Sequence, residues 1–565
     1  MRKSNKTLIA IICIVALFQS CKKCAEMPET INQTTLTIDY KKTAGVAIEL
    51  GEKKKNAYSI ESFMNAYLSL KKKEAQQRKS ENNWSSFLPD QQTMTQILVP
   101  NTKYLRVLPR NEDEYDALRD QNPTRVFYDF PIEYEITVQG NYYHDPSLPD
   151  TQITWQYVVL RNDENISISF QKQTVETDIF LPENSPVYSN YTEQFWTDLE
   201  TEALALNGYS TTMRLAQGTN PNTTDRYRPN GRILVRDYVT NTDVPLVGAK
   251  IICHASWRSS CGYTDANGNF SGNNTFITKC DYNIKWESDN KTNKFDVRSG
   301  WYGQAWSFIQ SNSYNACFVT LHTGWNKSLL YANIFRATYD FFNNDPFNLY
   351  KGLMPRMKIA GYTGEGTGVT HFIARIVGGP HIRVWDNNEV GNTLRTYGTT
   401  IHELGHAQQR SFGPTKFVTA SGLIRESWGD CVEWAFCNWK YNNTNLYTTD
   451  ASLFRWYRTN NFLNINTSNN EGTIYTCLFI DLVDNINNNS ELRNNTILIR
   501  NLNDNVGGYT LNQIQWALYY KGWLAQPNNI LDDIRDYLVS TYTNPTENNI
   551  NAYFNDFKNH DYPNR

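Results

Sequence analysis

Alternating apolar and polar positions mark two stretches of the chain as β-structure. Between residues 94 and 186, short alternating runs such as 104–108 and 132–138 are separated by Pro and Gly, which predicts a small β-rich domain. A second series begins at residue 233, where alternating runs are separated by turn phrases such as the one at 265–268. Strands joined by such turns predict a short sandwich with Greek-key connections.

Apolar residues at helical spacing predict most of the remaining elements. Helices are expected over 59–73, 193–206, 326–342, 474–483, 511–520 and 530–542. Together the patterns predict a multidomain α+β protein. The expected divisions are a signal segment at 1–21, a tether with a helix at 22–90, an N-terminal β-rich domain at 91–210, a β-sandwich at 228–300, a mixed α+β domain at 301–440 and a helical C-terminal subdomain at 441–565.

The first residues have the pattern of an export signal. Arg2 and Lys3 precede an apolar run over 8–18, which is too short to cross a bilayer of about 30 Å as a helix. Ser20 stands directly before Cys21, so the segment resembles a bacterial lipoprotein signal. The resemblance implies that Cys21 carries a lipid and anchors the exported protein to a bacterial membrane, expected to be the outer one. The alternative is an ordinary cleaved secretory signal.

Composition narrows the classes of protein. Hydrophobic residues make up 40% and charged residues 20%, which excludes a chain disordered throughout and a polytopic membrane protein. The net charge of −3 makes a nucleic-acid partner unexpected. Cys253, Cys261 and Cys280 fall in one strand-rich stretch, where export would permit a disulfide of undetermined pairing. The oligomeric state stays open.

The candidate chemistry begins with the H-E-x-x-H motif formed by His402, Glu403 and His406. On a helix, histidines four positions apart project from one face, and their imidazoles can occupy two corners of a tetrahedral zinc site. Glu403 is placed to polarise a water molecule there. Because the chain has only eight histidines, an accidental match is expected at about half a percent. The motif therefore predicts a zinc site.

A second expected helix, over 421–436, aligns three acidic residues. Glu426, Asp430 and Glu433 share a face at positions i, i+4 and i+7 among apolar residues. Buried acidic residues need a partner, and a zinc ion would supply one. Glu426 follows His406 by twenty positions, which leaves room for a connection and a returning helix.

The combined pattern resembles the gluzincins, the zinc metallopeptidase group typified by thermolysin: H-E-x-x-H, nineteen intervening residues, then E-x-x-x-D. The resemblance implies that His402, His406 and Glu426 bind one Zn²⁺ per chain. It also implies that Glu403 is the general base of peptide hydrolysis and that Asp430 orients a ligand histidine.

Three neighbouring features refine this resemblance. Residues 422–426, with Gln409, also resemble the plant basic-secretory-protein-like peptidases, whereas a metzincin would need Gly at 409 and His at 412. The turn order of the sandwich is similar to the carboxypeptidase-regulatory-like (transthyretin-like) module, an accessory domain. Phrases at 128–131 and 143–146 look like an N-terminal region of exported Bacteroidetes proteins. The sequence leaves open whether these preceding domains form a removable pro-region.

Gluzincins use a His or Tyr beyond the third ligand to stabilise the oxyanion. The only histidine after His406 is His560, in a polar tail, so a tyrosine is favoured. Tyr475 is the candidate, with core packing as the alternative. His381, expected on an edge strand, either helps to align substrate or has a structural role.

The sequence therefore predicts a lipid-anchored zinc metallopeptidase with a peptide or protein substrate. A peptidase of mucins or other glycoproteins, like the enhancin-related group, is an alternative that shares H-E-x-x-H-x-x-Q. A non-catalytic surface binding lipoprotein on a zincin scaffold is the alternative from another class. Glu403 discriminates between them, because a degenerate member has no reason to keep a base between its ligands.

Overall fold

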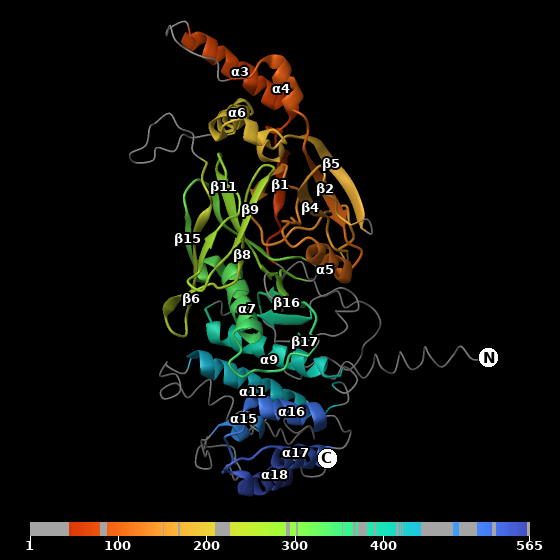
Figure 1. Ribbon diagram of the computed structural model, residues 1–565. Helices are drawn as coiled ribbons and strands as arrows, with labels where there is room; N and C mark the ends of the chain where they lie inside the picture. Colours follow the sequence, from red (N-terminus) through yellow and green to blue (C-terminus); the bar gives the residue numbers. More distant parts are fainter. Residues whose placement is uncertain are drawn as a thin grey trace, which may run out of the picture.

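The computed structural model is a multidomain α+β protein with several sheets, which confirms the expected fold class. Figure 1 shows the strands of the N-terminal domain beside the sandwich, with the mixed sheet below them and the C-terminal helices at the bottom of the view. No described helix is long and apolar enough to cross a membrane. Cys21 lies outside the described residues. These are 45–78, 88–150, 152–167, 170–209, 226–289, 294–300, 303–352, 354–364, 369–370, 381–388, 391–413, 417, 420, 422–441, 478–484, 505–521 and 527–561.

The N-terminal domain combines small antiparallel sheets with helices. One sheet has the strand order β4-β2-β5, and β1 pairs with β3. Its elements are β1 (Glu49–Lys53), α3 (Ile60–Arg78), α4 (Gln91–Ile97), β2 (Thr102–Leu108), α5 (Glu112–Gln121), β3 (Tyr134–Val138), β4 (Gln156–Arg161), β5 (Gln171–Ile179) and α6 (Glu193–Leu206).

The sequence predicted a tether over residues 22–90. Its described residues, 45–78 and 88–90, are folded into this domain. β1 adds to β3, and α3 packs against α6. Tyr58, Phe63 and Tyr67 are buried in a core that also contains Trp257 of the sandwich. The expectation of a tether therefore fails for these residues. The segment is polar on average, but it contains a few aromatic side chains, and their burial holds the segment against the domain.

The sandwich consists of two four-stranded sheets. One has the order β10-β6-β15 with β7 beside β6, and the other has the order β14-β11-β8-β9. Its strands are β6 (Asn230–Asp237), β7 (Thr242–Pro245), β8 (Lys250–Ala255), β9 (Arg258–Tyr263), β10 (Asn269–Ser271), β11 (Cys280–Lys285), β14 (Trp306–Ser313) and β15 (Cys317–Leu321).

Strand pairing differs from the boundary expected at residue 300. β12 (Glu287–Ser288) and β13 (Phe295–Arg298) precede it but belong to the next sheet, and β14 and β15 follow it but complete the sandwich. The chain thus leaves the sandwich and returns to it. Local alternation reveals strands but carries no information on their partners.

A five-stranded mixed sheet supports the region of the H-E-x-x-H motif. Its order is β12-β13-β16-β18-β17; β13, β16 and β18 are parallel, and β17 is an antiparallel edge. The new elements here and beyond are α7 (Asn326–Asn343), β16 (Met357–Tyr362), β17 (Val369–Thr370), β18 (Ile382–Trp385), α9 (Thr393–Ser411), α11 (Gly422–Tyr441), α15 (Leu478–Val483), α16 (Leu511–Lys521), α17 (Pro527–Thr541) and α18 (Glu547–Asp561).

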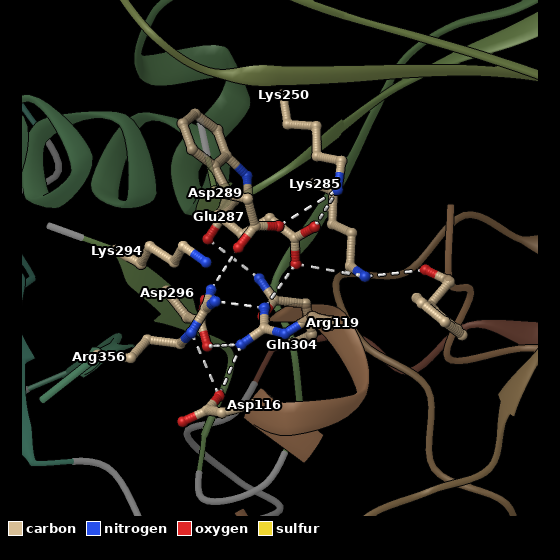
Figure 2. A network of polar contacts seen from close by, with 12 residues as sticks. Asp116, Arg119, Lys250, Lys285, Glu287, Asp289, Lys294, Asp296, Gln304 and Arg356 are labelled. Carbon is tan, nitrogen blue, oxygen red and sulfur yellow. Dashed lines mark hydrogen bonds and ion pairs between the residues drawn. The ribbon is translucent and has the colours of Figure 1, made fainter. Parts of the chain in front are cut away.

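Buried charges join α5 of the N-terminal domain to this mixed sheet (Figure 2). The Arg119 guanidinium donates to Glu287 at 2.8 Å and to Asp296 at 2.8 and 2.9 Å. Arg356 forms ion pairs with Asp289 and Asp296. Burial opposes the charge of Asp296, but the surrounding arginines outweigh it and hold the pKa of that carboxyl well below its usual range. The N-terminal domain is therefore bonded to the sheet through paired charges.

Candidate metal centre

The helices α9 and α11 pack against each other in an antiparallel arrangement. Gly398 of α9 lies at Glu433 of α11, and His402 lies at Gly429. Further along α9, His406 lies within 3.2 Å of Glu426. Positions thus rise on one helix as they fall on the other. This register places the polar faces of both expected helices against each other inside the protein.

Three side chains converge at this contact as the sequence predicts. The Nε2 atoms of His402 and His406 lie 3.4 and 3.2 Å from Oε2 of Glu426. The two imidazole rings are nearly perpendicular, at 88°, with centroids 4.7 Å apart. Ligand atoms bound at about 2.0 Å around a tetrahedral zinc are about 3.3 Å from one another. Both nitrogen-to-carboxylate distances therefore match the separation of ligand atoms in a tetrahedral site.

The electrostatics of the cluster also fit a cation. His402 faces carboxylate oxygens with both ring nitrogens: Glu426 at Nε2, and Asp430 and Glu433 at Nδ1. A neutral imidazole has one N–H, so one nitrogen directs a lone pair at a carboxylate. A metal ion could be held by Nε2 of His402 and the carboxylate of Glu426, and its positive charge would offset that repulsion. The two imidazole nitrogens and one carboxylate are a donor set suited to zinc.

Burial strengthens these interactions. His402, His406, Glu426 and Asp430 each expose at most 3% of their surface. Burial disfavours the charged form of Glu426, but the neighbouring His406 and His402 outweigh it and hold the pKa of Glu426 well below its usual range. Glu426 is thus kept as a carboxylate.

Two glycines provide the space for this arrangement. A Cβ at Gly429 would stand 2.8 to 3.1 Å from three atoms of the His402 ring, and a Cβ at Gly398 would stand 2.4 Å from Oε1 of Glu433. At Gly405, by contrast, the nearest atoms would be 3.5 Å away, an ordinary contact. Glycine within a helix costs about 1 kcal/mol relative to alanine. The sequence shows these glycines, but only the helix packing gives them a role.

The other predicted site residues have different outcomes. Glu403 is buried in α9 beside His402, with 2% of its surface exposed. Tyr475 lies outside the described residues. His381 pairs with the backbone of Lys358, where its N–H donates to the carbonyl at 2.8 Å and its Nδ1 accepts from the N–H at 3.3 Å. Because this contact ties β16 to the start of β18, an interior strand, the structural role of His381 is favoured.

Gln409, which the sequence linked to the motif, is fully buried, and neither side-chain amide atom has a hydrogen-bond partner among the described residues.

Cys253, Cys261 and Cys280 are free thiols, so the structure contains none of the disulfides that the sequence allowed among them.

No known family model matches the chain, and the curated proteins contain no match to its sequence. The functional argument therefore rests on the residues and geometry described above.

Proposed function

We propose that the protein is a zinc-dependent metallopeptidase whose metal ligands are His402, His406 and Glu426. The observation that carries this proposal is the placement of two Nε2 atoms 3.2 and 3.4 Å from one carboxylate oxygen, the spacing of a tetrahedral site. The cluster is buried, and both nitrogens of His402 face carboxylates, a charge arrangement that a cation would balance.

The residues support hydrolysis as follows. When bound, zinc supplies a Lewis acid that polarises a water molecule and the scissile carbonyl. Glu403 accepts the proton of the attacking water on its carboxylate and later donates it to the leaving amine. Asp430, whose Oδ1 lies 3.2 Å from Nδ1 of His402, would favour the proton on Nδ1 and so leave Nε2 for the metal. Glu403 is the residue that distinguishes a peptidase from a zinc-binding scaffold.

The sheet edge beside α9 supports an extended peptide as substrate. β17 is the antiparallel edge strand, and it lies next to α9, as Figure 1 shows. Among the described strands, only β18 pairs with β17. An extended peptide can add to such an edge through main-chain hydrogen bonds, which would align its backbone along the metal helix. The proposal therefore includes a peptide or protein substrate.

The proposal also covers the parts of the protein around the site. The mixed sheet with α9 and α11 is proposed as a zincin domain, and the sandwich as a carboxypeptidase-regulatory-like accessory module. Export and a lipid on Cys21 belong to the same proposal. Mass spectrometry of the N-terminal peptide from a membrane fraction tests the anchor: the expected result is a diacylated or triacylated Cys21, and an unmodified mature terminus contradicts it.

The experiment that tests the function compares purified protein from Lys22 onward with its Glu403→Gln variant. Both are analysed for zinc content and for hydrolysis of a mixed peptide library. The expected result is about one zinc per chain in both and cleavage by the wild type alone. If both bind zinc and neither cleaves, peptidase activity is rejected in favour of a binding role. If neither holds zinc, the metal centre is rejected as well.

A further inference from the structure

The Nδ1 atom of His402 faces two carboxylates. Asp430 Oδ1 and Glu433 Oε2 both lie 3.2 Å from it. Both acidic side chains are buried, with exposures of 0% and 4%. The resemblance to gluzincins assigns a role only to Asp430, so the contact of Glu433 is a property of this chain.

A feature of the opposite helix accommodates Glu433. Gly398 lies one turn before His402 on α9, and a Cβ there would stand 2.4 Å from Oε1 of Glu433 and 3.3 Å from its Cδ. Any larger residue at 398 would push the carboxylate away from the imidazole. The small residue on α9 and the acidic residue on α11 therefore form a matched pair that holds Glu433 at Nδ1.

We propose that Glu433 is a positioning residue of the metal centre, which acts together with Asp430 at Nδ1 of His402. Two carboxylate oxygens 3.2 Å from Nδ1 favour the tautomer with the proton on that nitrogen, which leaves the lone pair of Nε2 for the metal, and their charge makes the imidazole a stronger ligand. This inference rests on the proposed metal site. It adds that either carboxylate partly substitutes for the other, because each lies 3.2 Å from the same nitrogen.

The first test measures zinc affinity by competition with a chromophoric chelator. The variants are Glu433→Gln, Asp430→Asn and the double variant, with circular dichroism as a check of folding. Each single change is expected to weaken zinc binding about tenfold, within the range found for outer-shell partners. The double change is expected to weaken it by more than the product of the two single effects, because neither carboxylate remains to replace the other. A folded Glu433→Gln variant with wild-type zinc affinity overturns the inference. A variant that is less stable without metal but binds zinc as tightly as the wild type overturns it as well.

A second test leaves Glu433 in the sequence and displaces it. Gly398→Ala is expected to reproduce the roughly tenfold loss of zinc affinity. Gly405→Ala makes the same substitution in the same helix where the nearest atom would be 3.5 Å away, and it is expected to bind zinc within about twofold of wild type. In a Glu433→Ala background, Gly398→Ala is expected to have no further effect, since no carboxylate remains to be displaced.

The outcomes separate the two proposals. A wild-type chain that binds no zinc rejects the metal centre and, with it, the role of Glu433. If the wild type binds zinc and Gly398→Ala binds it with the same affinity, only the role of Glu433 is rejected. Zinc affinity is the readout in each case, so neither result depends on finding the peptide substrate.

Discussion

The imidazole of His402 lies against the backbone of Gly429 on the facing helix. A Cβ at position 429 would stand 2.8 Å from Cε1, 2.9 Å from Nε2 and 3.1 Å from Nδ1 of that ring. Distances below 3.0 Å are not found for real Cβ atoms, and the ring has no free space because it is 3% exposed. The close packing of α9 on α11 therefore fixes the orientation of the His402 imidazole.

Gly429→Ala is consequently expected to remove zinc binding. The added methyl must rotate or shift His402, which breaks its contact with Glu426, so zinc affinity should fall about 100-fold or more, at the upper end of the effects known for positioning groups. Chelator competition measures the loss, with Gly405→Ala as the matched control. Wild-type affinity in Gly429→Ala would show that His402 does not occupy the site in the described orientation.

Removal of the metal is expected to destabilise the domain that contains α9 and α11. A ligand that binds only the folded state adds about 4 kcal/mol at a thousandfold excess over its dissociation constant. Chelation should therefore lower the melting temperature by several degrees, and added zinc should restore it. Calorimetry with and without chelator tests this. The Glu426→Gln variant should show a much smaller shift, and an equal shift would locate the metal elsewhere.

Arg119→Ala is expected to lower the free energy of unfolding by about 3 kcal/mol, the lower end for a broken buried ion pair, because Glu287 keeps Lys250 and Asp296 keeps Arg356. The matched control is Arg161→Ala, since Arg161 pairs with Asp163 on the surface, where side chains are 52% and 65% exposed. That change should leave the free energy of unfolding nearly unchanged. Denaturant titration compares the two, and equal costs would contradict a structural role for the α5 network.

Acid destabilisation should depend on His254, which is packed near Tyr128 and Phe130. Burial, with only partial compensation by Asp281, lowers the pKa of His254 from 6.5 to about 4. The unfolded chain therefore binds more protons than the folded chain between these values, so stability falls as the pH drops from 6.5 to 4.

The expected contribution of His254 over this window is on the order of 2 kcal/mol. The unfolding free energy is measured at several pH values for wild type and for His254→Gln. The wild-type value minus the variant value should decrease as the pH falls. His322→Gln, at an exposed histidine, controls for a general effect of histidine loss. A difference that is constant with pH would show that His254 titrates alike in both states.

Local periodicity predicted which side chains come together at the candidate metal centre, because helical spacing is a local property. His402 and His406 share a face through their four-residue separation, and Glu426 and Asp430 do so on the next helix. The space at Gly398 and Gly429 depends instead on how two helices cross, which no repeat within one helix encodes. The second contact at His402 Nδ1 was unpredictable for the same reason.

The same distinction holds for the fold. Alternation located strands such as β6 and β11, and apolar stripes located helices such as α7. The return of β14 to the sandwich and the pairing of Arg119 with Glu287 join positions far apart in the sequence. Those contacts depend on tertiary pairing, which local patterns do not contain. The sequence therefore suggested a domain boundary at residue 300 and a tether before residue 90, whereas the structure has strands that cross the boundary and a core shared with the sandwich.

X-ray absorption spectroscopy of the zinc-loaded protein tests the central claim most directly, because it reads the ligands of the metal without a substrate. The account predicts one zinc per chain with nitrogen and oxygen ligands at about 2.0 to 2.2 Å, multiple scattering from two imidazoles, and loss of one imidazole in His406→Ala. A zinc ion bound through sulfur at about 2.3 Å, or a spectrum unchanged by His406→Ala, would contradict it.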